Sequence, residues 1–207
     1  MPSLNSRSRA ARLETKPGTL QSRAMADLQF IRETMASAAA YTAFSGWGLL
    51  AVGCGALATG VIASREATLR GNLAVWLVDG IASFCIGAIA STIKARASAQ
   101  PLFAGPIRKF SLSFAPAILV GAVLSFAMID SAAASFLPAT WLLLYGAGLI
   151  AAGTQSVWVI PVMGIAFFAV GVVSLLAPLA WANTLLTLAF AGFNAFFGIV
   201  IARRHGG

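Results

Sequence analysis

The sequence predicts an all-α membrane protein, in which about six transmembrane helices form a bundle behind an amphipathic helix and a basic tail. Hydrophobic residues make up 59% of the chain and charged residues only 10%, whereas a soluble domain carries about 25% charged residues. The mean hydropathy is +0.87, and the apolar runs approach the length that crosses ~30 Å of hydrocarbon. We therefore expect a lipid bilayer to be the main partner of this chain.

The first 24 residues are predicted to be a disordered, basic cytoplasmic tail. Residues 1–24 are rich in Ser, Arg and Ala and contain no apolar run that could be buried. No apolar stretch follows within the first 35 residues, so a cleaved signal peptide is not expected. The Arg-rich composition also resembles a mitochondrial transit peptide, but the small size and the Ala and Gly content of the chain favour a bacterial protein.

Residues 25–42 are predicted to form an amphipathic helix. Apolar side chains recur every three or four positions from Met25 to Met35, and charged residues lie off this stripe. We expect the helix to lie on the inner membrane surface, to pack under the bundle or to bind a cytoplasmic protein. The residues assigned to this partner-binding helix are Met25, Leu28, Ile31, Arg32, Glu33 and Met35.

Residues 43–207 are predicted to form the six-helix transmembrane domain. Each of the five Trp residues falls near the start of a span, at the headgroup level where its apolar ring and polar N–H are both accommodated. The last three spans are joined by short connections, which force neighbouring helices to be antiparallel. The predicted spans are 43–63, 73–93, 112–130, 139–154, 157–176 and 181–201.

The distribution of basic residues predicts the orientation. With the N-terminus inside, twelve Lys and Arg residues lie on the inner side, and only Arg65 and Arg70 lie outside. Cytoplasmic loops of membrane proteins carry this excess of positive charge. We therefore expect a multi-pass protein of the bacterial inner (plasma) membrane with both termini in the cytoplasm.

Several function classes are not expected from these residues. The net charge of +8 resides in tails and loops, so a nucleic-acid-binding face is not predicted. Cys54 and Cys85 lie within apolar runs as small packing residues, and His205 is the only histidine, so neither a metal site nor a cofactor is predicted. No Ser/His pair or pair of Asp residues suits an intramembrane enzyme, and we predict no catalytic residues.

Asp79 is the ionisable residue that lies well inside a predicted span. Placing a carboxylate at mid-bilayer costs ~2.5–3.5 kcal/mol on insertion scales, so such residues are rarely accidental. Asp79 begins a stripe of small and polar residues that includes Ser83 and Gly87 and invites close helix packing. A functional role, a structural hydrogen bond and a wet interfacial position all remain open. We expect a neutral Asp79 that bonds the sixth span near Asn183.

A second polar stripe runs along the sixth predicted span through Asn183, Thr187 and Asn194. If the two stripes share a seam, their polar groups provide the hydrogen-bond partners that hydrocarbon lacks. Helix–helix packing is the preferred interpretation of this seam, and solute binding is the alternative.

A short internal similarity suggests an inverted repeat of three spans per half. Gly46–Gly53 reads GWGLLAVG and Gly146–Gly153 reads GAGLIAAG, which are identical at five of eight positions. Inverted repeats occur in many transporters. Because Gly, Ala and Leu are abundant throughout, and because the segments sit at different depths, chance similarity is the preferred explanation.

The chain also resembles an uncharacterised family of bacterial six-helix membrane proteins. The residues that carry the resemblance are Ile31–Met35, Gly46–Gly48, Tyr145–Gly148, Pro161–Gly164 and Phe197–Gly207. The resemblance implies the class and the location but no activity. On the sequence alone, a non-enzymatic regulatory or accessory protein with a cytoplasmic protein partner is the preferred function. A small-solute or ion transporter or channel, assembled as a homo-oligomer, is the alternative.

Overall fold

The computed structural model describes residues 23–31, 45–97, 106–154 and 156–205. The chain divides into two compact units, Met1–Ala39 and Ala40–Gly207. Within the first unit, residues 23–31 form a helix in which every residue is exposed. The rest of the predicted helix 25–42 lies outside the described residues, as do the predicted tail up to residue 22 and the site residues Arg32, Glu33 and Met35.

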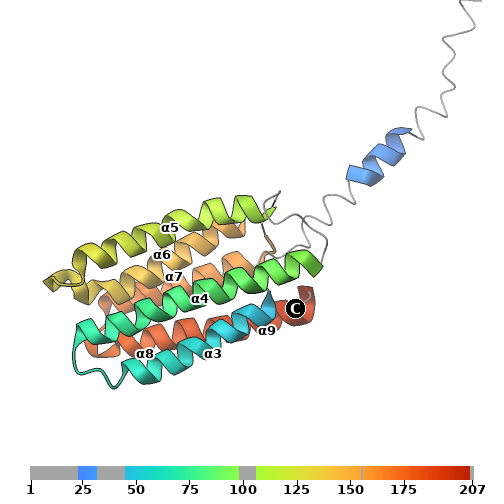
Figure 1. Cartoon of the computed structure of the whole chain (residues 1–207). Helices are drawn as coiled ribbons and strands as arrows, with labels where there is room; N and C mark the ends of the chain where they lie inside the picture. Colours follow the sequence, from blue (N-terminus) through green and yellow to red (C-terminus); the bar gives the residue numbers. More distant parts are fainter. Residues whose placement is uncertain (1–22, 32–44, 98–105, 155, 206–207) are drawn as a thin grey trace, which may run out of the picture. The chain divides into compact units, whose positions relative to one another are not determined.

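The second unit is a bundle of helices (Figure 1). Six helical segments of the described chain are long and apolar enough to cross a membrane. This confirms the predicted all-α class, and the chain is a multi-pass integral membrane protein. The first five spans are α3 (Gly46–Ala63), α4 (Leu69–Ala97), α5 (Pro106–Met128), α6 (Leu137–Gly153) and α7 (Val159–Leu176).

The sixth span is built from several pieces rather than from one regular α-helix. A short 3₁₀ turn, η2 (Leu179–Trp181), leads into α8 (Ala182–Thr187). A π-helical turn, η3 (Leu188–Phe193), follows, and α9 (Asn194–His205) completes the span. The hydrophobic pattern of the sequence located this span but did not predict the π-helical turn inside it.

The ends of the helices follow local capping chemistry. Ser45 precedes α3 and its Oγ accepts a hydrogen bond from the Gly48 N–H at 3.3 Å. Helix α5 begins at Pro106, a residue suited to the first helical position because its missing N–H needs no partner there. The predicted third span starts at residue 112, six residues after the observed start of α5, because the helix begins before the apolar run. Helix α6 begins before Pro138 and is preceded by the 3₁₀ turn η1 (Ala132–Phe136).

Helices α3 and α6 are central and α4 and α5 are peripheral. Helix α3 packs on α4 and on the sixth span, and α6 packs on α5 and α7. In the most apolar 18-residue window of each span, half of the residues of α3 and α6 are buried. The corresponding shares are 6% in α4 and 17% in α5. Most of the surface of α4 and α5 is therefore available to lipid.

Glycines allow two helix pairs to approach at backbone distance. A Cβ added at Gly46 would lie 2.6 Å from the Gly198 carbonyl oxygen, and a Cβ at Gly146 would lie 2.7 Å from that of Gly164. In both pairs the contact is reciprocal, because Cβ atoms at Gly198 and Gly164 would meet the opposite backbone at less than 3.0 Å. Small residues at such contacts are the usual device of membrane helix pairs.

The two glycine motifs pack against different spans. Gly46 of the first span packs against the sixth span, whereas Gly146 of the fourth span packs against the fifth. In a repeat of three consecutive spans, Gly46 would face α4 as Gly146 faces α7, but in this motif it is Gly48 that meets α4, at Ala90. The contacts of the two segments therefore differ, which favours chance similarity, the preferred explanation.

Three of the five Trp side chains are exposed and two are turned inward. Trp47, Trp158 and Trp181 are more than 60% exposed near helix ends, as expected for headgroup anchors. In contrast, Trp76 Nε1 donates to Asn183 Oδ1 and Trp141 Nε1 donates to Ser125 Oγ, both at 2.8 Å. For these two residues the expectation of an N–H bound to water at the headgroup level is wrong, because the protein itself supplies the acceptor.

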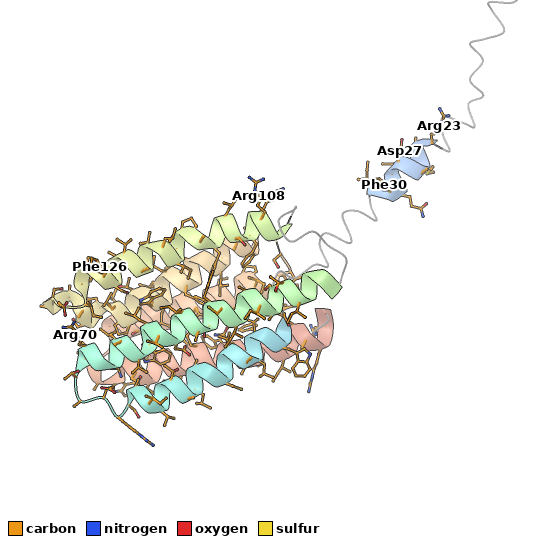
Figure 2. The ribbon with its side chains drawn as sticks, viewed as in Figure 1. Arg23, Asp27, Phe30, Arg70, Arg108 and Phe126 are labelled. Carbon is orange, nitrogen blue, oxygen red and sulfur yellow. The ribbon has the colours of Figure 1, made fainter. Side chains whose placement is uncertain are left out.

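Arg70 and Arg108 lie at opposite ends of the bundle (Figure 2), and these two ends differ in charge. The end near Arg70, called here the Arg70 end, has two basic and two acidic residues, and Arg70 Nη1 and Asp130 Oδ1 form an exposed ion pair at 2.8 Å. The opposite, C-terminal end has six basic residues and no acidic one among the described helices. These residues are Lys94, Arg96, Arg108, Lys109, Arg203 and Arg204.

Candidate functional site

Asn183 connects three spans at the Arg70 end of the bundle. Its Oδ1 accepts the hydrogen bond from Trp76 of α4, and its Nδ2 donates to the Gly60 carbonyl of α3 at 3.1 Å. One turn further along, the Thr187 hydroxyl donates to the Asn183 carbonyl at 2.8 Å and its side chain packs on Gly60. The side-chain amide is thus engaged at both its oxygen and its nitrogen, and these two predicted site residues hold helices together.

Asp79 contacts α3 rather than the sixth span. Its carboxyl group is hydrogen-bonded to the side chain of Thr59. A Cβ at Gly55, one turn before Thr59, would lie 3.5 Å from Asp79 Oδ1. The expected bond near Asn183 is therefore wrong, because Trp76 occupies that position. Asp79 keeps a structural hydrogen bond, and it is only partly buried.

The remaining part of the predicted α4 stripe is loosely packed. Ser83 is partly buried one turn beyond Asp79. A Cβ at Gly87, a further turn along, would meet no atom of the described protein within 4 Å. The predicted seam between α4 and the sixth span does not form along its length, since α3 packs against both of these elements.

The π-turn η3 keeps one row of residues of the sixth span facing α3. Without it, the residues after the turn would be rotated away from α3. The residues that contact α3 are Asn183, Thr187, Ala191, Ala195, Gly198 and Ala202. The first three steps in this series are four residues each, so Asn183 to Ala195 covers 12 residues in three turns. A regular α-helix uses about 11 residues for three turns. The π-turn therefore accommodates one extra residue while small side chains stay on α3.

Asn194 closes the π-turn with two of its own N–H groups. Its backbone N–H is directed to the Ala191 carbonyl, three residues back. In a regular α-helix the same N–H would bond the Phe190 carbonyl, four residues back. Here the Asn194 side chain replaces it, because Nδ2 donates to the Phe190 oxygen at 2.7 Å. Asn194 thus stabilises its own helix, whereas the sequence predicted contacts with a neighbouring helix.

The side-chain oxygen of Asn194 is the exceptional atom of this site. Asn194 is 0% exposed, and its Oδ1 has no hydrogen-bond donor among the described residues. A buried acceptor without a donor costs about 1–3 kcal/mol, and π-turns are frequent at functional sites. The combination of an unpaired buried amide oxygen and a π-turn makes this position the candidate functional site.

Aromatic rings fill the space around the π-turn. The Phe167 ring of α7 lies 5.1 Å from Phe190 and 5.3 Å from Phe193, measured between ring centroids. Tyr145 of α6 lies 4.7 Å from Phe167 and 5.1 Å from Phe190. Edge-to-face contacts at these distances are favourable. The rings connect the sixth span to α6 and α7 and surround the candidate site with apolar surface.

Two hollows of the surface lie away from Asn194. One hollow of about 180 Å³ lies among η1, α6, α7 and α8, next to Ser135 and Ser174. Another, of about 310 Å³, is lined by Glu66, Asn72 and Asn183 at the Arg70 end. The Asn72 and Asn183 amides are already bonded to backbone carbonyls of α3. Among the described residues no group of three His, Cys, Asp or Glu side chains could hold a metal ion.

The π-turn was missed by sequence reasoning, although a signal was present. Two small residues, Ala191 and Ala195, continue the series from Thr187 at intervals of four. Steps of four without an intervening step of three are typical of a helix that contains one extra residue. The role of Asn194 could not be found this way, because its partner belongs to the backbone of its own helix.

Comparison of the chain with protein-family models, with curated proteins and with solved structures found no match.

Proposed function

We propose that this multi-pass membrane protein is a non-enzymatic regulatory or accessory protein of the bacterial inner membrane, which binds a cytoplasmic protein through the helix at residues 23–31. The observation that carries the proposal is the exposed apolar face of this helix. Met25, Leu28 and Ile31 recur at intervals of three and are each at least half exposed. An amphipathic helix with anchors at this spacing fits the hydrophobic groove of a partner protein.

A protein groove suits this helix better than a lipid surface. Arg23 and Asp27 are its charged residues within the described range and they balance each other. Helices that lie on anionic membranes carry an excess of Lys and Arg on their polar face. The neutral charge of residues 23–31 therefore favours a protein partner.

The charge asymmetry of the bundle supports a cytoplasmic location for this helix. Six basic residues lie at the C-terminal end and no net charge lies at the Arg70 end. By the positive-inside rule, the C-terminal end faces the cytoplasm. The described chain enters the first span at Gly46 and leaves the last at His205 on that same end (Figure 1). Both termini are then cytoplasmic, and a periplasm-active reporter fused after Gly207 is expected to be silent.

A photo-crosslinking amino acid tests the proposed interaction in living cells. Placed at Leu28 of the full chain, it is expected to form a protein adduct of defined mass. Placed at Ala26, on the opposite side of the same helix, it is expected to form none. Leu28→Asp should abolish the adduct formed from a crosslinker at Met25, and Ala26→Asp should preserve it. Lipid adducts at Leu28, or equal adducts at both positions, would contradict the proposal.

A transporter or channel for a small solute, assembled as a homo-oligomer, is the second candidate. The interrupted sixth span with its buried, unpaired Asn194 oxygen favours it, because broken helices line the solute sites of many transporters. The aromatic packing around Phe190 argues for a narrow or closed path. A solute flux in proteoliposomes that Asn194→Leu abolishes, without loss of folded protein, would favour this candidate over the first.

A further inference from the structure

We propose that Asn194 and the π-turn form a binding site for one small, neutral hydrogen-bond donor, of the size of water or of a single hydroxyl group. The proposal is independent of a cytoplasmic partner. It rests on the orientation of the Asn194 amide, on the burial of this side chain and on the absence of charge around it.

The Phe190 carbonyl fixes the orientation of the Asn194 amide. The nitrogen and oxygen of an amide can be exchanged by a flip of the side chain. Here a flip would place Oδ1 against the Phe190 oxygen at 2.7 Å, two acceptors facing each other. The nitrogen must therefore face Phe190, and Oδ1 must point away from it.

Among the described residues, two other buried side-chain atoms have no partner, and they differ from Asn194 Oδ1. They are the hydroxyl oxygens of Ser156 and Ser174. A serine hydroxyl rotates and can donate to a nearby carbonyl, whereas an amide oxygen can only accept. For Asn194 Oδ1 the complementary group must be a donor, and because no described residue supplies it, we assign this role to a ligand that brings an O–H or N–H.

The surroundings of Asn194 select a neutral donor. The rings that enclose the π-turn belong to Tyr145, Phe167, Phe190 and Phe193, and at neutral pH none of them carries a charge. Within the described spans and away from the helix ends, Asp79 is the residue with an acidic or basic side chain, and it is bonded to Thr59 of α3. A cation at Asn194 would lack a counter-charge in a low-dielectric site, and an anion would face an acceptor.

The burial of Asn194 limits the size of the ligand. The residue is 0% exposed, and the ring centroids beside it are 5.1–5.3 Å apart. Neither of the two hollows described above is lined by Asn194. A ligand larger than a water molecule or a hydroxyl group would have to displace these rings.

Selective ¹⁵N labelling of asparagine tests the proposal, because the chain contains only Asn5, Asn72, Asn183 and Asn194. In the full chain, reconstituted with deuterated lipid, the Asn194 Nδ2–H protons should show through-space cross-peaks to water and should exchange in D₂O. Asn194→Leu identifies the signal. If that variant does not fold, substitution of the other three asparagines identifies it by elimination.

Each outcome of this measurement is informative. Cross-peaks to water identify water as the donor. Cross-peaks to the methyl protons of added, undeuterated methanol, which carries a single hydroxyl group and whose methyl protons do not exchange with water, identify a solute hydroxyl as the donor. Cross-peaks to side-chain protons alone, with amide signals that persist in D₂O as long as those of the buried backbone, would overturn the proposal. A dry Asn194 would leave the cytoplasmic-partner proposal unaffected.

Discussion

The fifth and sixth spans solve the same packing problem in different ways. Helix α7 presents Gly164 and Gly171, seven residues apart, to α6 and remains a regular α-helix. The sixth span also presents small residues to a glycine-bearing helix, yet it contains a π-turn between Thr187 and Asn194. The comparison shows that close packing alone does not require a π-turn.

Because α7 packs closely without a π-turn, the extra residue of the sixth span must have a role other than close packing. A π-turn is equivalent to one residue inserted into an α-helix, and it needs local support. Asn194 supplies that support through its bond to the Phe190 carbonyl. The same turn buries an acceptor that finds no donor in the described protein. This arrangement costs stability, and the comparison with α7 shows that close packing does not require it.

The largest effect is expected where the two spans are alike. Gly46→Leu and Gly146→Leu each place a side chain against the backbone of the facing helix. Each should lower the free energy of unfolding in mixed micelles by about 3 kcal/mol or more. Gly87→Leu is the matched control, since a Cβ at Gly87 meets no atom within 4 Å. An equal loss for Gly87→Leu would show that the glycines act through helix propensity rather than through contact.

The next effect separates the two spans. Asn194→Leu removes the side-chain donor to the Phe190 carbonyl, which costs about 1–3 kcal/mol, and also removes the unpaired Oδ1, which offsets part of that loss. Phe196→Leu, on the exposed side of α9, should cost much less. The loss caused by Asn194→Leu should shrink when Gly192 is also deleted, because a regular helix gives Phe190 a backbone donor. A double-mutant cycle of unfolding free energies measures this coupling, and perfect additivity would contradict it.

A smaller effect is expected at the Arg70 end of the sixth span. Trp76→Phe removes the donor to Asn183 Oδ1 but keeps an aromatic ring against Phe190. The expected loss is about 1 kcal/mol, typical of one hydrogen bond. Trp47→Phe, at an exposed position, is the control. Unfolding curves of both variants check the difference, and equal losses would mean that the Trp76–Asn183 bond contributes nothing.

The smallest effect is expected at Asp79. Asp79→Asn should leave the unfolding free energy nearly unchanged, because an amide oxygen can still accept from Thr59. Asp79→Leu should cost about 1 kcal/mol, since Thr59 on α3 then loses its partner. If both variants unfold like the wild type, the bond between Asp79 and Thr59 is not structural. If Asp79→Asn alone abolishes a proton-coupled flux, the transporter candidate gains support.

Hydropathy was sufficient to predict the class, the number of spans and the approximate place of each. It could not predict helix ends such as Pro106, because the first turn of α5, which contains Arg108 and Lys109, is polar and precedes the apolar run. Hydropathy also could not predict which helices pack together. The helical period placed Asp79 and Ser83 on one face of α4, but it did not show that α3 would pack against that face. The seam residues Asn183 and Thr187 were located, but Trp76 was taken for a headgroup anchor. The role of Asn194 depended on a backbone irregularity that residue type does not reveal.

Two single-residue deletions test the central claim, that the sixth span carries one residue beyond its packing register, most directly. Gly192 lies in the π-turn with open space around it. Its removal should restore a regular helix, keep Ala195, Gly198 and Ala202 on α3, and leave the unfolding free energy at or above that of the wild type. Removal of Ile165, an exposed residue between Gly164 and Gly171 of α7, should rotate one glycine off α6 and destabilise strongly. Equal destabilisation by both deletions would contradict the account.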